Sequence, residues 1–359
     1  MPTMLRPAMA AEPDFGRLEM ALRRRGTPDR VPLIELFSDV ELTILRALGE
    51  LRPRPSADEV DWHLRQHLAH QLALGYDYLK VLPDGFHFPR AERAGGLTAE
   101  GWRYYQRAAA RTIADWDDFG RYPWPDPTAA DLRPLDRAAR LMPRAMRLLT
   151  GVTGVMERAL PLLGYEGLGY LLHDDEELVA ATLDQVGQRV LAMVEALAQH
   201  PAVGAVYVSD DLGFRTQTLV SPALLRRYVF PWHRRLTAAV HACDKPVILH
   251  TCGNLAQVME DVIACGWDAK HSFEDAIEPV WEAKARWGDR LALLGGFDMD
   301  RLTRGSVAQV RAHAERLLAT CAAGGGYALG TGNSVTSYVP LANYFEMVRT
   351  GLSWRGAGA

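Results

Sequence analysis

An imidazole and a thiol lie two residues apart in this sequence, at the end of an apolar run. Residues 246–254 read PVILHTCGN. A continuous apolar run bounded by Pro and Gly predicts a strand buried on both faces. Side chains two apart on a strand point the same way, so His250 and Cys252 would lie side by side where this strand ends. The pair could be half of a metal site or a nucleophilic pair.

Zinc is the metal that this pair favours, because thiolate and imidazole are the ligands that zinc prefers. A catalytic zinc ion also needs a third protein ligand and an open position. His271 and Glu274 follow the next predicted strand, so they could complete the metal shell or support it from behind. In the alternative interpretation, His250 hydrogen-bonds a neighbouring loop and Cys252 is a small buried hydrophobe.

Carboxylates close other predicted strands. Asp210 and Asp211 end the strand at 205–210, and they could orient a polar substrate or act as a general base. Alternatively, they accept backbone N–H bonds from the next loop. Successive strand residues point oppositely, so only one of the two should face the site. Asp84, after an earlier strand, is a third catalytic candidate. The substrate-binding candidates at strand ends are Glu35, Lys80, His87, Asp298 and Asn333.

A regular alternation of strands and helices would gather these residues. Strand patterns begin near residues 31, 76, 146, 205, 246, 268, 291 and 327, and a helical pattern follows each of them. The helix after the strand at 205 begins at Ser221-Pro222, and the helix after the strand at 291 covers 306–322. Such an alternation of eight units predicts an α/β fold, a single (β/α)₈ barrel with its chemistry at the carboxyl ends of the strands. The long stretch between the second and third strands predicts an excursion over the molecule. Residues 1–14 are expected to be a flexible lead, and 15–359 the barrel domain.

Composition excludes several classes of protein. The net charge of −4 provides no electrostatic footprint for nucleic acid or an anionic membrane. No apolar run approaches the ~20 residues that a membrane-spanning helix needs. Four cysteines in a chain of 359 residues do not make a disulfide framework. We therefore expect a cytoplasmic protein with reduced thiols, acting on a small molecule.

Several stretches together resemble the uroporphyrinogen decarboxylase superfamily, nearest to its cobamide-dependent methyltransferase branch. They cover nearly the whole chain in order. They read TPDRVPLIELF (27–37), YPWPDP (122–127), SDDLGFRTQTLVSPALLRRYVFPWHRRL (209–236), PVILHTCGN (246–254), GDRLALLGGFDMDRL (288–302), GGGYALGTGN (324–333) and VPLANY (339–344). The resemblance implies a (β/α)₈ barrel, in agreement with the strand count.

The methyltransferase branch implies a specific chemistry. Its His-x-Cys pair binds zinc together with a cysteine in the loop after the last strand, and the zinc activates a thiol that takes a methyl group from a corrinoid protein. The third position falls at Asn333, or at Thr331, and neither is a cysteine. Either Glu274 or His271 substitutes for it, or the metal has been lost.

The decarboxylase branch implies a different site. Its catalytic aspartate after the second strand falls at Asp84. The arginine-rich motif that clamps the substrate's propionates is absent, and residues 35–39 read ELFSD instead. The sequence thus favours a methyltransferase-like enzyme that moves a methyl group between a corrinoid or methylated small molecule and a thiol-type acceptor. The alternatives are a metal-free decarboxylase or lyase that uses Asp84 with Lys80 or His87, and a corrinoid- or tetrapyrrole-binding carrier without chemistry of its own.

Overall fold

A single curled sheet of seven parallel strands organises the molecule. The computed structural model describes residues 12–53, 60–90, 94–98, 101–105 and 111–355. The sheet has the order β1-β4-β5-β6-β7-β8-β9. Its strands are β1 (Tyr78–Lys80), β4 (Arg147–Thr153), β5 (Val203–Ser209), β6 (Val247–His250), β7 (Ala269–His271), β8 (Ala292–Leu294) and β9 (Tyr327–Ala328). The predicted α/β fold is confirmed, with seven of its eight strands.

The first predicted strand, at 31–37, is an extended segment whose backbone bridges on one side only, to the chain just after β9. Toward β9, Ile34 N–H donates to the Leu329 carbonyl at 2.9 Å. Toward β1, the contact is a side chain: the Tyr78 hydroxyl accepts from Glu35 N–H at 2.8 Å and donates to the Glu35 carbonyl at 3.0 Å. The prediction of an eighth ladder strand is therefore corrected. A buried phenol takes the place of strand-to-strand hydrogen bonds, and the ring of strands is not fully closed.

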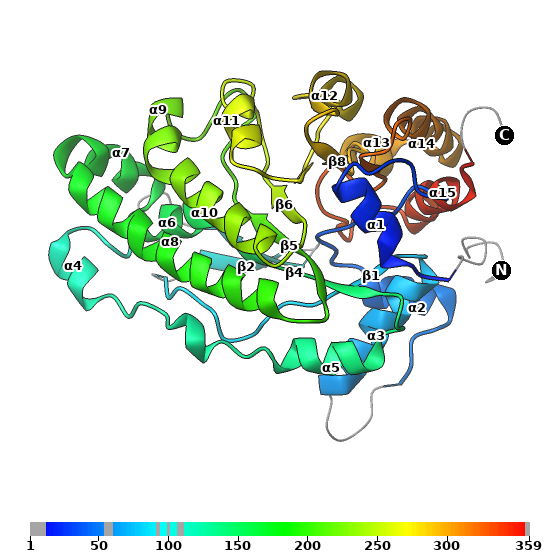
Figure 1. Ribbon diagram of the computed structural model, residues 1–359, viewed down its shortest axis with the longest axis horizontal. Helices are drawn as coiled ribbons and strands as arrows, with labels where there is room; N and C mark the ends of the chain where they lie inside the picture. Colours follow the sequence, from blue (N-terminus) through cyan, green and yellow to red (C-terminus); the bar gives the residue numbers. More distant parts are fainter. Residues whose placement is uncertain (1–11, 54–59, 91–93, 99–100, 106–110, 356–359) are drawn as a thin grey trace.

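Helices cover the outside of the sheet (Figure 1). The long helix α8 (Glu176–Gln199) lies against β4 and β5, and α10 (Phe230–His241) lies against α8 and β6. Helix α1 (Phe15–Leu22) contacts β5 and β9 and closes the amino-terminal end of the sheet. The other helices are α2 (Glu41–Leu48), α3 (Val60–Ala73), α4 (Trp116–Arg121), α5 (Arg133–Leu141), α6 (Val155–Leu163), α7 (Tyr165–Asp174), α9 (Pro222–Leu224), α11 (Met259–Ala264), α12 (Val280–Trp287), α13 (Met299–Arg304), α14 (Val307–Cys321) and α15 (Leu341–Ser353).

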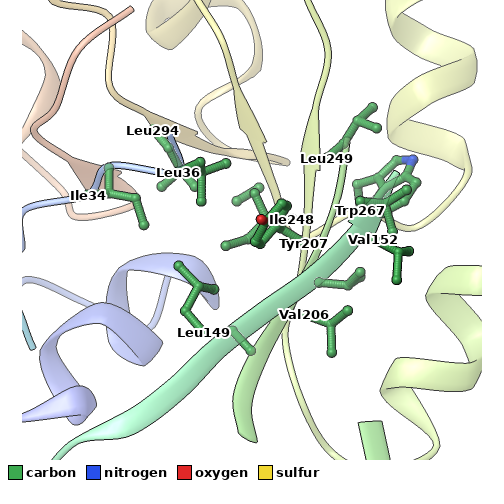
Figure 2. Packing of buried hydrophobic residues seen from close by; sticks show 14 of the residues in the cluster. Ile34, Leu36, Leu149, Val152, Val206, Tyr207, Ile248, Leu249, Trp267 and Leu294 are labelled. Atoms are coloured by element: carbon green, nitrogen blue, oxygen red, sulfur yellow. The ribbon is translucent and has the colours of Figure 1, made fainter. Parts of the chain in front are cut away.

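The interior of the sheet is filled by apolar side chains from several strands (Figure 2). Ile34 and Leu36 of the extended segment gather there with Leu149 of β4, Ile248 of β6 and Leu294 of β8. All five are 0 % exposed. Burying such a side chain contributes about 1.5–3 kcal/mol each. This packing holds the extended segment in the ring although its backbone forms only isolated bridges to the chain after β9.

The predicted excursion lies between β1 and β4. It contains an antiparallel hairpin of β2 (Ala94–Thr98) and β3 (Gly101–Tyr105), followed by α4, a 3₁₀ turn at Pro127–Ala129, and α5. Its start packs on α6, where the Arg158 guanidinium lies 5.0 Å from the ring centre of Phe86 and 4.8 Å from that of Phe88. The excursion therefore begins against α6, and its later part, with α4 and the 3₁₀ turn, lies against α8.

The helices and the amino-terminal segment bear on two further predictions. None of the helices in the described part of the chain is long and apolar enough to cross a membrane. Residues 1–11 of the predicted flexible lead lie outside the described residues. Asp14 is the N-cap of α1, and its side chain accepts a hydrogen bond from Gly16 N–H at 2.9 Å.

Candidate metal centre

Strand register brings a third donor to the predicted His-Cys pair. Ser209 at the end of β5 pairs with His250 at the end of β6. Asp211 and Cys252 each follow two residues later, so they lie alongside one another. The backbone N–H of Cys252 donates to Oδ1 of Asp211 at 2.9 Å. Asp211, which the sequence suggests for substrate positioning, thus joins the pair at the carboxyl end of the sheet.

The donor atoms of Asp211, His250 and Cys252 lie within 4.8 Å of one another. We call these three residues the triad. Sγ of Cys252 lies 3.6 Å from Nε2 of His250, which lies 3.9 Å from Oδ1 of Asp211. Zinc bonds of about 2.0 Å to nitrogen and about 2.3 Å to sulfur, at a tetrahedral angle, separate the two donors by about 3.5 Å. Sulfur, nitrogen and carboxylate oxygen are also zinc's usual donors, so the triad fits zinc.

The protonation states of Cys252 and His250 determine whether a cation must displace a proton from each of them in order to bind. Burial, reinforced by the Asp211 carboxylate, raises the pKa of Cys252 to about 12. Burial lowers the pKa of His250 well below its ordinary value, so its imidazole is neutral. A metal ion therefore meets a free imidazole but has to displace the proton of a thiol, which makes binding pH-dependent.

The backbones of the two loops that carry the triad are in direct contact. Asn254 N–H donates to the Phe214 carbonyl at 2.7 Å. Gly253 has a φ of +85°, and a β-carbon there would lie 2.2 Å from the carbonyl carbon of Gly213. Only glycine permits this approach. The loops after β5 and β6 are thereby fixed against each other beside Cys252.

His271 lies behind His250, on the side away from the other two donors. It is 0 % exposed, and burial lowers its pKa to about 4. Its Nδ1 lies 2.8 Å from Nδ1 of His250, and its Nε2 lies 3.1 Å from the Thr331 carbonyl. The ring of Phe37 meets the His250 ring edge to face, with 4.7 Å between centres. His250 is thus held by neighbours, and His271 contacts a donor residue without joining the triad.

Asn333 occupies the place beside Cys252. Its Nδ2 donates to Sγ of Cys252 and to Oε1 of Glu274, at 3.4 Å in each case. The resemblance places a third thiolate at Asn333 or at Thr331, and of these two Asn333 directs an N–H donor at the sulfur. Glu274 thus contacts Asn333, and it is not one of the three donors of the triad. Asp298 accepts hydrogen bonds from the backbone of Asp275 and Arg301, so it fixes the loop after β7 to the start of α13.

The fold separates the two neighbouring aspartates. Asp210 is 0 % exposed and accepts hydrogen bonds from Val155 N–H at 3.0 Å and Glu157 N–H at 2.8 Å. Its Oδ2 also lies 2.8 Å from Nε2 of the buried His233. Asp210 therefore ties β5 to the beginning of α6, while the Asp211 side chain is 39 % exposed beside the other donors.

The remaining predicted residues lie apart from the triad. Glu35 is buried and accepts hydrogen bonds from Thr331, and Lys80 donates to the Leu36 carbonyl at 2.5 Å. Asp84 and His87 lie 3.8 Å from each other on the excursion, with side chains 77 % and 80 % exposed. Glu35 and Lys80 are therefore engaged in hydrogen bonds within the fold, and Asp84 and His87 lie at the surface of the excursion.

An open cleft of about 800 Å³ adjoins the triad. Its lining includes Phe214, Arg215, Cys252, Glu274 and Arg301. Its volume is within the usual range for small-molecule sites, about 300–1,000 Å³. The exposed edge of the triad thus opens on space for a substrate.

Sequence reasoning missed one acidic neighbour of the triad. Glu157, in the first turn of α6, accepts a hydrogen bond from the Ser209 hydroxyl at 2.9 Å. Burial and the nearby Asp211 carboxylate raise the pKa of Glu157 to about 7. An acidic residue in the first turn of a helix that follows a barrel strand is the signal that could have found it.

Comparison with known proteins relates the chain to two kinds of enzyme. The family model of uroporphyrinogen decarboxylase matches residues 108–353. The methylcobamide:CoM methyltransferase MtaA of Methanosarcina barkeri is 28 % identical over 158 residues, 44 % of this chain and 42 % of the relative. The uroporphyrinogen decarboxylase of Pseudomonas aeruginosa (strain LESB58) is 26 % identical over 191 residues, 50 % of each.

A solved structure extends the similarity to the fold as a whole. A methyltransferase from Methanosarcina mazei superposes with a TM-score of 0.65 at 18 % identity, covering 93 % of this chain and 97 % of the other. The chain spans half or less of the length of the two curated relatives.

Proposed function

The chain belongs to the uroporphyrinogen decarboxylase family, and from this premise we propose that it is a methyltransferase-like enzyme with a zinc ion held by Asp211, His250 and Cys252. It would move a methyl group from a corrinoid or a methylated small molecule to a thiol-type acceptor. The observation that carries the proposal is the triad, which brings three zinc donors together, with Cys252 in the lining of a cleft. The similarity to a methylcobamide:CoM methyltransferase supports it.

The residues of the chain have distinct parts in this proposal. Bound zinc would lower the pKa of an acceptor thiol, so that its sulfur attacks as a thiolate. The Asp211 carboxylate and the Cys252 sulfur, once the cation has displaced its proton, would balance the two charges of the cation. Asn333 donates its amide hydrogen toward the Cys252 sulfur, a bond that favours the thiolate form. In the transfer, the bond between the methyl group and its donor would break as the sulfur–carbon bond forms, with the electron pair left on the donor. The proton of the acceptor thiol would pass to water.

The same proposal assigns surroundings and partners. Glu274 and Asn333 would contact the substrate beside the metal, and Asp298 would hold their loop in place. A corrinoid protein would be the partner if the donor is a corrinoid. All four cysteines are free, which supports a reducing compartment such as the cytoplasm.

Metal analysis tests the proposal directly. The protein is purified without a chelator or a His-tag, and zinc is measured by mass spectrometry in the wild type, Cys252→Ala and Asp211→Asn. We expect close to one equivalent in the wild type and a loss of most zinc in both variants. Cys243→Ala, which removes a half-buried thiol outside the triad, is the matched control and should keep its zinc. Equal zinc in the wild type and Cys252→Ala would refute the metal site.

A metal-free decarboxylase or lyase is the second candidate, favoured by the similarity to a uroporphyrinogen decarboxylase. Activity that survives Cys252→Ala but is lost in Asp84→Asn would support it. A corrinoid-binding carrier is distinguished by anaerobic titration with a methylcobamide. A carrier binds the methylcobamide and leaves its cobalt spectrum methylated, whereas the transferase demethylates it when a thiol is present.

A further inference from the structure

We infer that His271 is a positioning residue, which fixes the nitrogen through which His250 can bind a cation. The inference rests on the proposed function for its purpose, because it concerns the same triad. It follows from the direction of two hydrogen bonds between buried groups.

The first bond assigns the hydrogen of His271. Its Nε2 lies 3.1 Å from the Thr331 carbonyl oxygen, and a carbonyl oxygen only accepts. Nε2 of His271 must therefore carry a hydrogen. In a neutral imidazole one nitrogen donates and the other accepts, so Nδ1 of His271 is an acceptor.

The second bond transmits this assignment to His250. The two Nδ1 atoms lie 2.8 Å apart, and one of them must donate. Because Nδ1 of His271 accepts, Nδ1 of His250 carries the hydrogen and its Nε2 is bare. That bare nitrogen lies 3.6 Å from Sγ of Cys252 and 3.9 Å from Oδ1 of Asp211. The opposite tautomer would direct a hydrogen at the place of the cation.

The surroundings fix the arrangement. Thr331 is itself held by Glu35, which accepts from its backbone N–H at 2.8 Å and from its hydroxyl at 2.6 Å. Gly295 leaves room for the contact, since a β-carbon there would lie 2.2 Å from the Thr331 oxygen and 3.0 Å from Nε2 of His271. His271 and Thr331 are both 0 % exposed, so bulk water does not replace either bond. His271 thus orients His250 from within the barrel.

A pair of variants separates hydrogen bonding from packing. The amide of His271→Gln has one acceptor and one donor group, so it can reproduce both bonds, whereas His271→Leu fills space without either. Zinc affinity is measured by competition with a chelator, and the absorption spectrum is recorded after cobalt substitution. We expect His271→Leu to bind zinc roughly 10- to 100-fold more weakly, with an altered cobalt spectrum. His271→Gln should stay within a few-fold of the wild type.

Two outcomes of this comparison would overturn the inference. One is unchanged affinity in His271→Leu, and the other is an equal loss in both variants. Circular dichroism checks that each variant is folded. Nitrogen-15 spectra of the metal-free wild type, labelled at histidine, provide a test without any substitution. A bare Nε2 on His250 is expected, and an Nε2–H tautomer would overturn the inference. If the wild type binds no zinc, the proposed function fails, while these spectra still decide the tautomer.

Discussion

Glu35 carries a carboxyl group whose ionisation the fold controls. Burial raises its pKa from 4.5 to about 8, although Thr331 donates two hydrogen bonds to it. The folded protein keeps the proton at pH values where the unfolded chain has lost it. The stabilisation is therefore complete below about pH 4.5 and is lost as the pH rises toward 8, at about 1.4 kcal/mol per pH unit.

Urea unfolding at pH 5.5, 7 and 8.5 measures this dependence. Between pH 5.5 and 8.5, the free energy of unfolding should fall by roughly 2–4 kcal/mol less in Glu35→Gln than in the wild type. The reason is that the amide does not ionise. Glu177→Gln, at an exposed position in the first turn of α8, serves as the control and should leave the slope unchanged. An identical slope in the wild type and Glu35→Gln would contradict a raised pKa.

At the level of residues, the sequence predicts what lies close along one strand. His250 and Cys252 share a strand end, and period-2 geometry was sufficient to place them together. Asp211 comes from the neighbouring strand, and its place depends on the pairing of Ser209 with His250. No local pattern encodes that register. His271 could be placed near His250, but whether it binds a cation or orients another ligand depends on ring orientation.

Asp210 and Asp211 show how one element can carry a structural group and a reactive group in succession. Asp210 is buried against α6 and accepts two backbone hydrogen bonds, so Asp210→Ala leaves these N–H groups and His233 without their partner. We expect a loss of about 3–5 kcal/mol in the free energy of unfolding. Asp211→Ala should cost less than about 1 kcal/mol, because its side chain is partly exposed.

Denaturant unfolding and zinc content, measured on both variants, check this contrast. Asp211→Ala is expected to fold well and lose zinc. Asp210→Ala is expected to unfold early, yet to bind zinc while it remains folded. Equal stability of the two variants would contradict the assignment of Asp210 to the start of α6.

At the level of elements, helices with clear start signals agree best with their predictions. The helix predicted at 306–322 is α14, Val307–Cys321, whose Ser306 cap forms a capping box with Gln309. Short helices without an apolar period were missed, including α13 at Met299–Arg304. The helix predicted from Ser221-Pro222 begins there, but it contains a π-helical stretch at Leu225–Val229. Such a stretch arises from packing and leaves no clear mark in the sequence.

At the level of the whole molecule, Tyr78 joins the extended segment to β1 across the gap in the ring of strands. Its hydroxyl bonds both the N–H and the carbonyl of Glu35, where the extended segment meets β1 without a ladder. Tyr78→Phe leaves two buried backbone groups unsatisfied, at an expected cost of about 1–3 kcal/mol each. We also expect faster amide hydrogen exchange across residues 31–38, measured by mass spectrometry.

Tyr338→Phe is the control, because it removes a hydroxyl from a side chain that is 50 % exposed. It should change neither the free energy of unfolding nor the amide exchange of residues 31–38. Unchanged exchange at 31–38 in Tyr78→Phe would show that apolar packing alone holds the extended segment beside β1.

The overall architecture was predictable because apolar runs mark buried strands and turn residues separate them. The alternation placed all seven strands of the sheet and the excursion before β4. The remaining predicted strand, the first in the chain at 31–37, has the same apolar signature as the other seven. Whether its backbone pairs with that of β1 depends on Tyr78, whose phenol occupies the interface between two segments far apart in sequence. A pattern of hydrophobicity does not show whether a side chain or a neighbouring strand will bond the backbone of this segment.

The contact between Gly213 and Gly253 has a thermodynamic consequence for the site. Two main chains meet there without intervening side chains, so Asp211 and Cys252 share one rigid support. The conformational entropy lost in gathering their donor atoms is spent during folding, and little of it remains to oppose capture of an ion. An arriving metal thus encounters preorganised ligands, and its release requires no separation of the two loops.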